Sequence, residues 1–326
     1  MRTDCHQHLW PEPLLEALRS RRTAPRLDGW TLHLDGEAPY TVRPADNDPV
    51  ARAERERAEG TGRVLLSFSS PLGVEHLPDA EGAPLLAAWH AGACALGAPF
   101  GVWAAAGVAE QDAAALARVL ADPAVVGLQL PATALAEPAA LERIGGLLET
   151  LERADRPLLV HPGPAQRPDR GPRTTPPWWP AVVPYVAQMH AAWYAWHAAG
   201  RSSFPRLRVA FVALAGLAPL HHERLAARGG ALGRIDPAVY YETSSYGTRA
   251  IDATLRVTGV DALVHGSDRP YAEPTDPGLG DAFSHALFVA NPQRLLEGAS
   301  TRSSISWPAA SRSPDSDRSA MSAART

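Results

Sequence analysis

Two histidines near the start of the chain have the type and spacing of metal ligands. The sequence reads Asp4-Cys5-His6-Gln7-His8-Leu9, so His6 and His8 are two residues apart. In an extended strand, residues two apart point to the same face, and both imidazoles can hold one cation. Imidazole suits zinc and similar divalent metals, and a catalytic site needs a further protein ligand and an open position for water.

Two further candidate ligands follow apolar segments far along the chain. His161 ends the run Leu158-Leu159-Val160-His161, and Asp268 closely follows the run Ala262-Leu263-Val264. If these runs are strands of one closed parallel barrel, their carboxyl ends meet above the barrel axis. Three imidazoles and one carboxylate would then surround a divalent ion and leave room for a bound water.

Each of these signals also has a structural explanation. The histidine pair can be two hydrogen-bonded side chains on a strand, and His161 before Pro-Gly can cap a strand end. Asp268 can bond to its own backbone in a turn. Asp4 shares the face of His6 and His8, and we expect it either to orient a ligand or to make a structural hydrogen bond deeper in the fold.

Short apolar segments alternate with helix-like segments along most of the chain. The predicted strands are 2–8, 63–69, 100–106, 125–130, 157–161, 207–214, 238–243 and 261–266. The predicted helices are 49–59, 81–96, 111–121, 138–154, 181–199, 219–229, 247–258 and 281–296. This alternation predicts an α/β fold, a closed (β/α)8 TIM barrel.

Three segments depart from this rhythm. Residues 28–43 alternate around Asp35-Gly36, which predicts a small β-hairpin inserted after the first strand and able to roof the site. Residues 162–180 are rich in Pro, Arg and Gly and form the longest candidate lid. We expect one metal-dependent barrel domain over 1–296 and a disordered Ser/Arg-rich tail over 297–326.

Composition narrows the classes of function. The 326 residues are 45% hydrophobic and 20% charged with a net charge of -4, which is typical of a globular protein and gives no basic stripe for nucleic acid. Two cysteines, no signal-like start and no membrane-length apolar run predict a cytoplasmic protein with no membrane association. All 31 basic residues are Arg, which excludes a carboxylated lysine bridge and favours a single metal.

These motifs together resemble the amidohydrolase superfamily, in particular its amidohydrolase-related branch, which includes non-oxidative decarboxylases. The resemblance rests on the HxH pair, Val160-His161-Pro162-Gly163 and Gly266-Ser267-Asp268-Arg269-Pro270, and it covers roughly residues 1–296. It implies that His6 and His8 are first-strand metal ligands, that His161 is the fifth-strand ligand, and that Asp268 binds metal and shuttles protons.

The chain departs from the pattern of this branch at the sixth strand. Ala213 stands where relatives carry a histidine that polarises the substrate or positions water, and His221 and His222 lie too far along to replace it. The fourth strand ends in Gln129, where binuclear relatives carry a lysine, which agrees with a single metal.

Several other residues are candidates for contact with a substrate or a partner. We expect Trp10, Trp178, Trp179, Glu242 and Ser245 to contact substrate, with lid anchoring or turn chemistry as the alternatives. His190, with Trp193 and Tyr194 on one helix, is expected in helix packing or in a homo-oligomer contact.

The sequence favours a metal-dependent hydrolase of an ester, lactone or amide-like bond. One divalent ion, most simply Zn²⁺ with Mn²⁺ or Fe²⁺ as alternatives, would activate a water on a small-molecule substrate, and Asp268 would transfer the proton. The alternative is non-oxidative decarboxylation of an aromatic or unsaturated acid. A second alternative is a barrel that binds a metal or ligand without catalysis.

Overall fold

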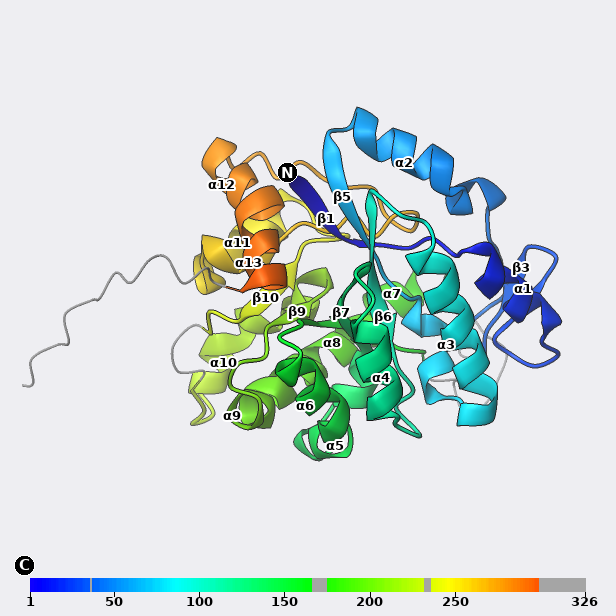
Figure 1. The fold of residues 1–326 in the computed structure, drawn as a ribbon. Coiled ribbons are helices and arrows are strands. Elements are labelled where there is room, and N and C mark those ends of the chain that lie inside the picture. Colours follow the sequence, from blue (N-terminus) through cyan, green and yellow to red (C-terminus); the bar gives the residue numbers. More distant parts are fainter. Residues whose placement is uncertain (36, 166–174, 232–235, 299–326) are drawn as a thin grey trace, which may run out of the picture.

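A sheet of eight parallel strands forms the centre of the molecule in the computed structural model (Figure 1). The structure describes residues 1–35, 37–165, 175–231 and 236–298. In sheet order the strands are β1 (Arg2–Gln7), β5 (Thr61–Leu66), β6 (Phe100–Ala105), β7 (Val125–Pro131), β8 (Leu158–His161), β9 (Val209–Phe211), β10 (Val239–Glu242) and β11 (Leu263–Val264). All eight predicted strands are present.

Backbone hydrogen bonds close this sheet into a barrel. Beyond the end of β11, the amide of Asp268 donates to the carbonyl of His6 at 2.9 Å, and the amide of His8 donates to the carbonyl of Arg269 at 2.7 Å. The amide of Cys5 donates to His265 in the same way at 2.8 Å. The last strand therefore lies beside the first, as a (β/α)8 barrel requires.

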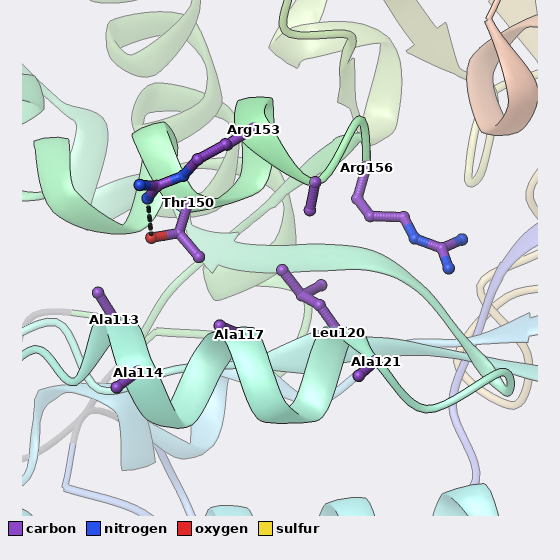
Figure 2. A pocket seen from close by; sticks show the side chains of 9 residues that line it. Ala113, Ala114, Ala117, Leu120, Ala121, Thr150, Arg153 and Arg156 are labelled. Carbon is purple, nitrogen blue, oxygen red and sulfur yellow. Dashed lines mark hydrogen bonds between the residues drawn. The ribbon is translucent and has the colours of Figure 1, made fainter.

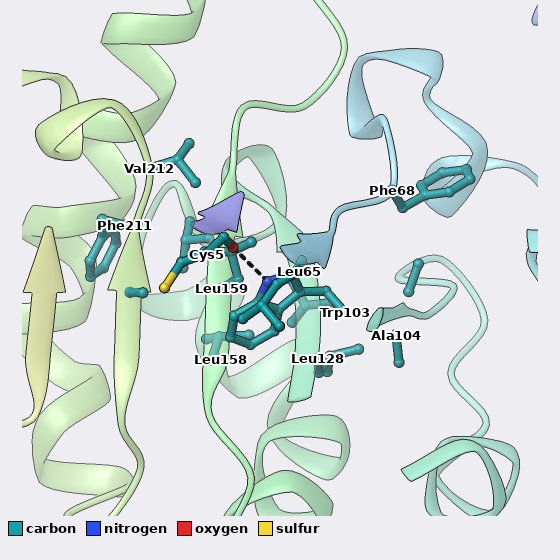
Figure 3. Close-up of a cluster of buried hydrophobic side chains, with 14 of the residues drawn as sticks. Cys5, Leu65, Phe68, Trp103, Ala104, Leu128, Leu158, Leu159, Phe211 and Val212 are labelled. Atoms are coloured by element: carbon teal, nitrogen blue, oxygen red, sulfur yellow. Dashed lines mark hydrogen bonds between the residues drawn. The ribbon is translucent and has the colours of Figure 1, made fainter. Parts of the chain in front are cut away.

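Apolar side chains fill the space within and around the barrel (Figure 3). Every residue of β6 and β7 is buried, which is typical of parallel strands covered on both faces. The Trp103 indole donates to the carbonyl of Cys5 at 2.9 Å and so links β6 to β1 across the core. Gly127 is required beside it, since a Cβ there would lie 2.3 Å from the carbonyl oxygen of Pro157.

Helices surround the barrel and alternate with its strands (Figure 1). They are α1 (Glu12–Ser20), α2 (Pro49–Ala58), α3 (Asp79–Cys94), α4 (Ala113–Leu120), α5 (Pro138–Arg143), α6 (Gly145–Arg153), α7 (Trp179–Val182), α8 (Pro184–Ala195), α9 (Arg201–Ser203), α10 (His222–Ala226), α11 (Thr248–Thr258), α12 (Asp281–His285) and α13 (Asn291–Glu297). Aspartates begin two of them: Asp48 accepts from the Val50 and Ala51 amides of α2, and Asp112 accepts from the Ala115 amide of α4.

Short helical turns occupy many of the connections. They are η1 (Pro44–Asn47), η2 (Ser70–Leu72), η3 (Val74–His76), η4 (Ala132–Leu135), the π-helical η5 (Trp196–Gly200), η6 (Ala213–His221), η7 (Val260–Ala262) and the π-helical η8 (Ala286–Ala290). Four of the predicted helices are consequently divided. The segment 138–154 forms α5 and α6, 181–199 is divided among α7, α8 and η5, 281–296 is interrupted by η8, and 219–229 contains the end of η6 and the short α10.

A small antiparallel sheet lies between the first barrel strand and α2, as predicted, and β2 adds one strand and one turn to the expected hairpin. Its strands are β2 (Arg26–Asp28), β3 (Thr31–His33) and β4 (Tyr40–Thr41), and α1 precedes them. The tight turn falls at Gly29-Trp30, because Gly29 adopts a φ of 58° that suits glycine. The expected turn at Asp35-Gly36 lies at a break in the described residues.

Parts of the other two predicted excursions lie outside the described residues. The structure describes 162–165 and 175–180 of the candidate lid, and the expected tail is described only to residue 298. Among the described helices, none has the length and apolar character needed to cross a bilayer.

A hollow of about 620 Å³ lies on the outer layer, between α4 and α6 (Figure 2). Alanines line most of it, and Arg153 on its edge donates to Thr150 at 3.2 Å. It contains none of the predicted metal ligands, so the candidate site lies elsewhere, at the carboxyl ends of the strands.

Candidate metal centre

The structure brings together the four side chains that the sequence nominated as metal ligands. His6, His8, His161 and Asp268 each offer one ligand atom, and these atoms all lie within 4.8 Å of one another. The Nε2 atoms of His6 and His8 are 3.1 Å apart, and Asp268 Oδ1 lies 3.2 Å from His8 Nε2. The three imidazole centroids are 4.9 to 5.1 Å apart.

The outer nitrogen of each imidazole is engaged by an oxygen acceptor. His8 Nδ1 lies 3.0 Å from the carbonyl of Ser67, and His161 Nδ1 lies 2.8 Å from the carbonyl of Pro162. His6 Nδ1 lies 3.3 Å from Glu242 Oε2. A carbonyl or an ionised carboxylate only accepts, so the proton is assigned to Nδ1 and the Nε2 lone pair faces the centre. This donor set fits a divalent cation.

Glu242 contacts His6, and its predicted contact with substrate stays a prediction. Its side chain is fully buried at the end of β10. Besides His6, its Oε2 accepts from the Ala213 amide and the Ser244 hydroxyl, and its Oε1 accepts from the Ser244 amide. These contacts engage both oxygens within the protein.

Gly266 provides the room that Glu242 needs. A Cβ at this position would lie 2.1 Å from Glu242 Oε1, so any other residue would displace the carboxylate from His6. A glycine at the first position of Gly266-Ser267-Asp268 indicates that another group packs closely there. The sequence does not indicate that this group is Glu242.

Burial and mutual contact set the protonation of the centre. Burial lowers the pKa of His8, and burial together with the adjacent His6 and His8 lowers the pKa of His161 well below its usual range. Burial also acts to lower the pKa of His6, but Glu242 outweighs it and raises that pKa. For Asp268, burial acts upward, yet the His8 hydrogen bond and the neighbouring imidazoles lower the pKa. Asp268 is therefore ionised at neutral pH.

Asp4 makes the structural hydrogen bonds that were one of its two predicted roles. Its Oδ1 accepts from the amides of His6 at 3.0 Å and Ser267 at 3.1 Å, and its Oδ2 accepts from Gln7 Nε2 at 2.8 Å. The carboxylate thus fixes β1 to the turn that carries Asp268, and it contacts no imidazole of the centre.

The tryptophans occupy two different environments. Trp10 is 2% exposed and donates its indole N–H to Ser69 at 2.9 Å; Ser69 Oγ lies 3.2 Å from His8 Nδ1. The indole is thus linked to His8 through Ser69, and the expected contact of Trp10 with substrate stays a prediction. Trp178 and Trp179 are exposed at the start of α7, and Ser245 is exposed after β10, so their contact with substrate stays a prediction.

The end of the sixth barrel strand contributes backbone and no ionisable side chain. Ala213 follows β9, and its amide donates to Glu242 at 3.2 Å. From Ala213 to Leu217 the backbone has φ between 49° and 61°, a short left-handed segment that only glycine adopts without strain. The predicted absence of a sixth-strand histidine at the site is thus accompanied by an unusual local backbone.

Tyrosines that the sequence analysis did not single out lie at the mouth of the site. Tyr271 follows Asp268 by three residues, and its ring packs edge-on against His8 at 5.3 Å. Its hydroxyl is within hydrogen-bonding reach of Ser69 and of Tyr40 on β4. Tyr185 of α8 donates to Glu37 of the same insertion. The small sheet therefore covers part of the mouth, and long sequence separations concealed these contacts.

Comparison with known proteins identifies similarity in structure and none in sequence. No protein-family model matches the chain, and no curated protein matches it by sequence. Three similar solved structures are an IDCase from Metarhizium anisopliae, an amidohydrolase II, and a 5-carboxyvanillate decarboxylase from Novosphingobium aromaticivorans. The last is a complex with manganese and 4-hydroxy-3-methoxy-5-nitrobenzoic acid.

The similarity extends over nearly the whole barrel. The IDCase is 16% identical with a TM-score of 0.74, covering 91% of this chain and 97% of its own. The amidohydrolase II is 18% identical with a TM-score of 0.68, covering 91% and 99%. The manganese complex is 16% identical with a TM-score of 0.66, covering 91% and 96%. At these identities the comparisons establish a shared fold.

Proposed function

We propose that this protein is a metal-dependent, non-oxidative decarboxylase of an aromatic or unsaturated carboxylic acid, related to the amidohydrolase superfamily. The observation that carries the proposal is the cluster of His6, His8, His161 and Asp268 at the strand ends of this barrel. Two of the three similar structures described above are named as decarboxylases or decarboxylase-type enzymes, and one of them holds manganese. This reverses the order of the two enzymatic hypotheses that the sequence suggested.

The four ligands can hold one divalent ion, for which Zn²⁺ and Mn²⁺ are the leading candidates. When bound, such an ion supplies a positive charge that holds the substrate carboxylate and draws electron density toward it. Glu242, Ser67 and Pro162 keep the three imidazoles in the orientation that leaves Nε2 free. The chain thus provides a preorganised anion-binding centre at the barrel mouth.

Decarboxylation breaks the bond between the carboxyl carbon and the substrate carbon. The bonding electron pair stays on the substrate carbon, carbon dioxide leaves, and a proton takes its place. Asp268 is the acidic group next to the imidazoles, and its side chain is 21% exposed, so it can exchange protons with solvent. Because Asp268 is ionised at neutral pH, it first takes a proton from solvent, and we assign to it the relay of that proton to the substrate carbon.

Tyr271 and Tyr40 are proposed to contact the body of the substrate. Both are partly exposed, and Tyr271 adjoins His8 and Asp268. Aromatic rings offer an apolar wall, and their hydroxyls can donate to substituents on a substrate ring. Trp178 and Trp179 are retained as further candidates because their rings lie exposed, 5.9 Å apart.

Hydrolysis of an ester, lactone or amide-like bond receives less support. The sixth-strand position Ala213 offers only its backbone amide to Glu242, and from the sequence this departure counts against decarboxylation as well. The preference for decarboxylation therefore rests on the similar structures that are named as decarboxylases. A decarboxylase needs a carboxylate-binding centre and a proton donor, and the described residues can provide both. A barrel that only binds a ligand remains the outcome if no turnover is found.

The test is product analysis in isotopically labelled water. Protein loaded with one equivalent of Mn²⁺ or Zn²⁺ is incubated with a panel of hydroxylated aromatic acids, unsaturated acids, esters and lactones in H₂¹⁸O. We expect metal-dependent carbon dioxide release with no ¹⁸O in the organic product. Incorporation of ¹⁸O into a product of ester or lactone cleavage would instead establish the hydrolase, and no metal-dependent turnover would contradict both.

A further inference from the structure

A second pair of histidines lies away from the candidate metal centre, between α8 and η6. His190 is on α8 and His221 is the last residue of η6. Their ring centroids are 4.9 Å apart and their planes meet at 86°. The ligand pairs of the metal centre have centroid separations of 4.9 to 5.1 Å and interplanar angles of 78° to 83°. The two imidazoles are thus spaced like a chelating pair.

The ring nitrogens of this pair make no hydrogen bond within the described part of the chain. The contrast with neighbouring histidines is direct. His222 Nδ1 lies 3.2 Å from the carbonyl of Pro219, and His197 Nδ1 lies 2.8 Å from the carbonyl of Trp193. His190 and His221 therefore keep nitrogen lone pairs that a cation can use.

Both rings can be reached and His190 is in the form that binds metal. His221 is exposed and His190 is half-buried. Burial lowers the pKa of His190, and the nearby His221 lowers it further, so that ring is neutral at physiological pH. A neutral imidazole is the ligand form for zinc and related metals.

The backbone holds the two elements at a fixed distance. Gly216 of η6 packs so closely on α8 that a Cβ there would lie 2.5 Å from the carbonyl oxygen of Val186. The left-handed conformation of η6 ends shortly before His221. The two histidines are therefore held by packed backbones that do not have to rearrange to bind an ion.

We propose that His190 and His221 form a second site for a late first-row divalent metal such as Zn²⁺, Ni²⁺ or Cu²⁺. Two imidazoles bind one ion, and water completes its coordination. Such an ion joins η6 to α8. Gln188 of α8 in turn accepts from the Gly163 amide at 2.8 Å and donates to Pro164 at 3.0 Å, in the loop that follows His161. The second site is therefore connected through α8 to the loop that follows His161.

The experiment is a calorimetric titration of the full-length, metal-free protein with Zn²⁺. Wild type is expected to show two binding events, a tight one at the four-ligand centre and a weaker one at the pair. His221→Ala should lose only the weaker event, and His161→Ala should lose only the tighter one. His222→Ala is the matched control, since it removes an adjacent histidine that is already hydrogen-bonded, and it should retain both.

His190→Ala provides a second route to the same result, with circular dichroism to establish that the variant is folded. The proposal is overturned if wild type shows a single event, if His221→Ala and His190→Ala both retain two events of unchanged affinity, or if His222→Ala removes the weaker one. None of these outcomes depends on the reaction catalysed, so the test is independent of the decarboxylase proposal.

Discussion

The two sides of the barrel mouth are built in different ways. On one side, where β11 and the turn after it meet β1, ionised side chains and backbone bonds hold His6, His8 and Asp268. On the other side, after β9, Ala213–Leu217 presents a left-handed backbone that has no ionisable group. Three of the four candidate ligands therefore lie along the seam that closes the barrel, while His161 comes from β8 across it. Among the described residues, the end of β9 contributes the Ala213 amide.

A buried ion network fixes the seam behind the ligands. Arg269 is 4% exposed in its side chain and contacts Glu56 at 2.7 Å, Glu59 at 2.7 Å and Glu273 at 3.2 Å. Arg52 of α2 donates to the carbonyl of His8 at 3.0 Å. Because Arg269 directly follows Asp268, this network determines where the carboxylate lies. The side of the barrel mouth that carries His6, His8 and Asp268 is thus also the side that is held by buried ion pairs.

Removing the carboxylate from the seam should have the largest effect. Asp268→Asn keeps the shape of the side chain but removes its charge and its capacity to transfer a proton, so turnover should fall by about 10²–10⁴-fold. Steady-state rates on the substrate found in the product screen measure this. Retention of wild-type rates in a folded variant would show that Asp268 has no catalytic role.

Removing Arg269 from the buried ion network should lower the free energy of unfolding. Arg269→Leu removes the ion-pair partner of buried Glu56, which keeps only the hydrogen bond from Gln7, and should destabilise the protein by about 3–5 kcal/mol in urea unfolding at pH 7. Glu273→Gln is the control: this exposed partner should contribute no more than about 1 kcal/mol. Similar losses in the two variants would mean that burial of the network is unimportant.

Glu75, after β5, is a buried carboxylate without an ion-pair partner among the described residues, in contrast to Glu56. It is fully buried, accepts from the Ser70 hydroxyl, and its Oε2 has no partner among the described residues. Burial raises its pKa from 4.5 to about 7. The folded state favours the protonated carboxyl, so this group contributes its full stabilisation below the pKa of the unfolded chain. That contribution to the free energy of unfolding is lost as pH rises through the pKa of the folded protein.

Wild type should therefore lose about 3 kcal/mol between pH 5 and pH 8 relative to Glu75→Gln, which cannot ionise. Urea unfolding at several pH values measures the difference. Parallel stability curves for the two proteins would contradict a raised pKa at Glu75.

Loosening the orientation of one ligand should have a smaller effect than removing it. Glu242→Gln replaces an acceptor with a group that can present an N–H to His6 Nδ1, so metal affinity should fall by about 10–100-fold. Competition with a metal-binding dye measures the affinity. Ser245→Ala, an exposed neighbour, is the control and should bind metal as wild type does; equal affinity in all three would remove the assigned role of Glu242.

The smallest expected effect lies on the sixth-strand side. Ala213 has a φ of 50°, so Ala213→Gly should relieve strain and stabilise the protein by about 1 kcal/mol. Ala192→Gly, in the regular helix α8, should have the opposite sign with a similar size. Thermal unfolding compares the two, and a loss of stability at both positions would contradict the assignment of strain.

Much of this architecture could be predicted, because it follows from simple periodicities. Eight apolar segments predict the barrel strands. Because the carboxyl ends of the strands meet at one mouth of a barrel, His161 and Asp268 are then expected beside His6 and His8. The contact of Glu242 with His6 could not be predicted, since 236 residues separate them and no spacing connects them. Nor could the left-handed backbone of Ala213–Leu217, because alanine and leucine normally favour right-handed helix.

Two of the expected substrate contacts also have partners within the protein. Trp10 and Glu242 were expected at the substrate because polar and aromatic residues at strand ends often face a pocket. In the fold, their hydrogen-bonding groups are used by Ser69, Ser244 and His6. The predicted hairpin around Asp35-Gly36 corresponds to the antiparallel pairing of β3 with β4, in which Thr31 pairs with Thr41. The sequence did not single out the additional tight turn at Gly29.

The most direct test of the central claim is a metal assay on wild type and His161→Ala after each is loaded with Mn²⁺ and dialysed. The arrangement of three imidazoles and one carboxylate predicts one tightly held ion per wild-type chain and none in the variant, with both proteins folded. A wild-type chain that holds no ion, or a variant that holds it equally well, would contradict the proposed centre.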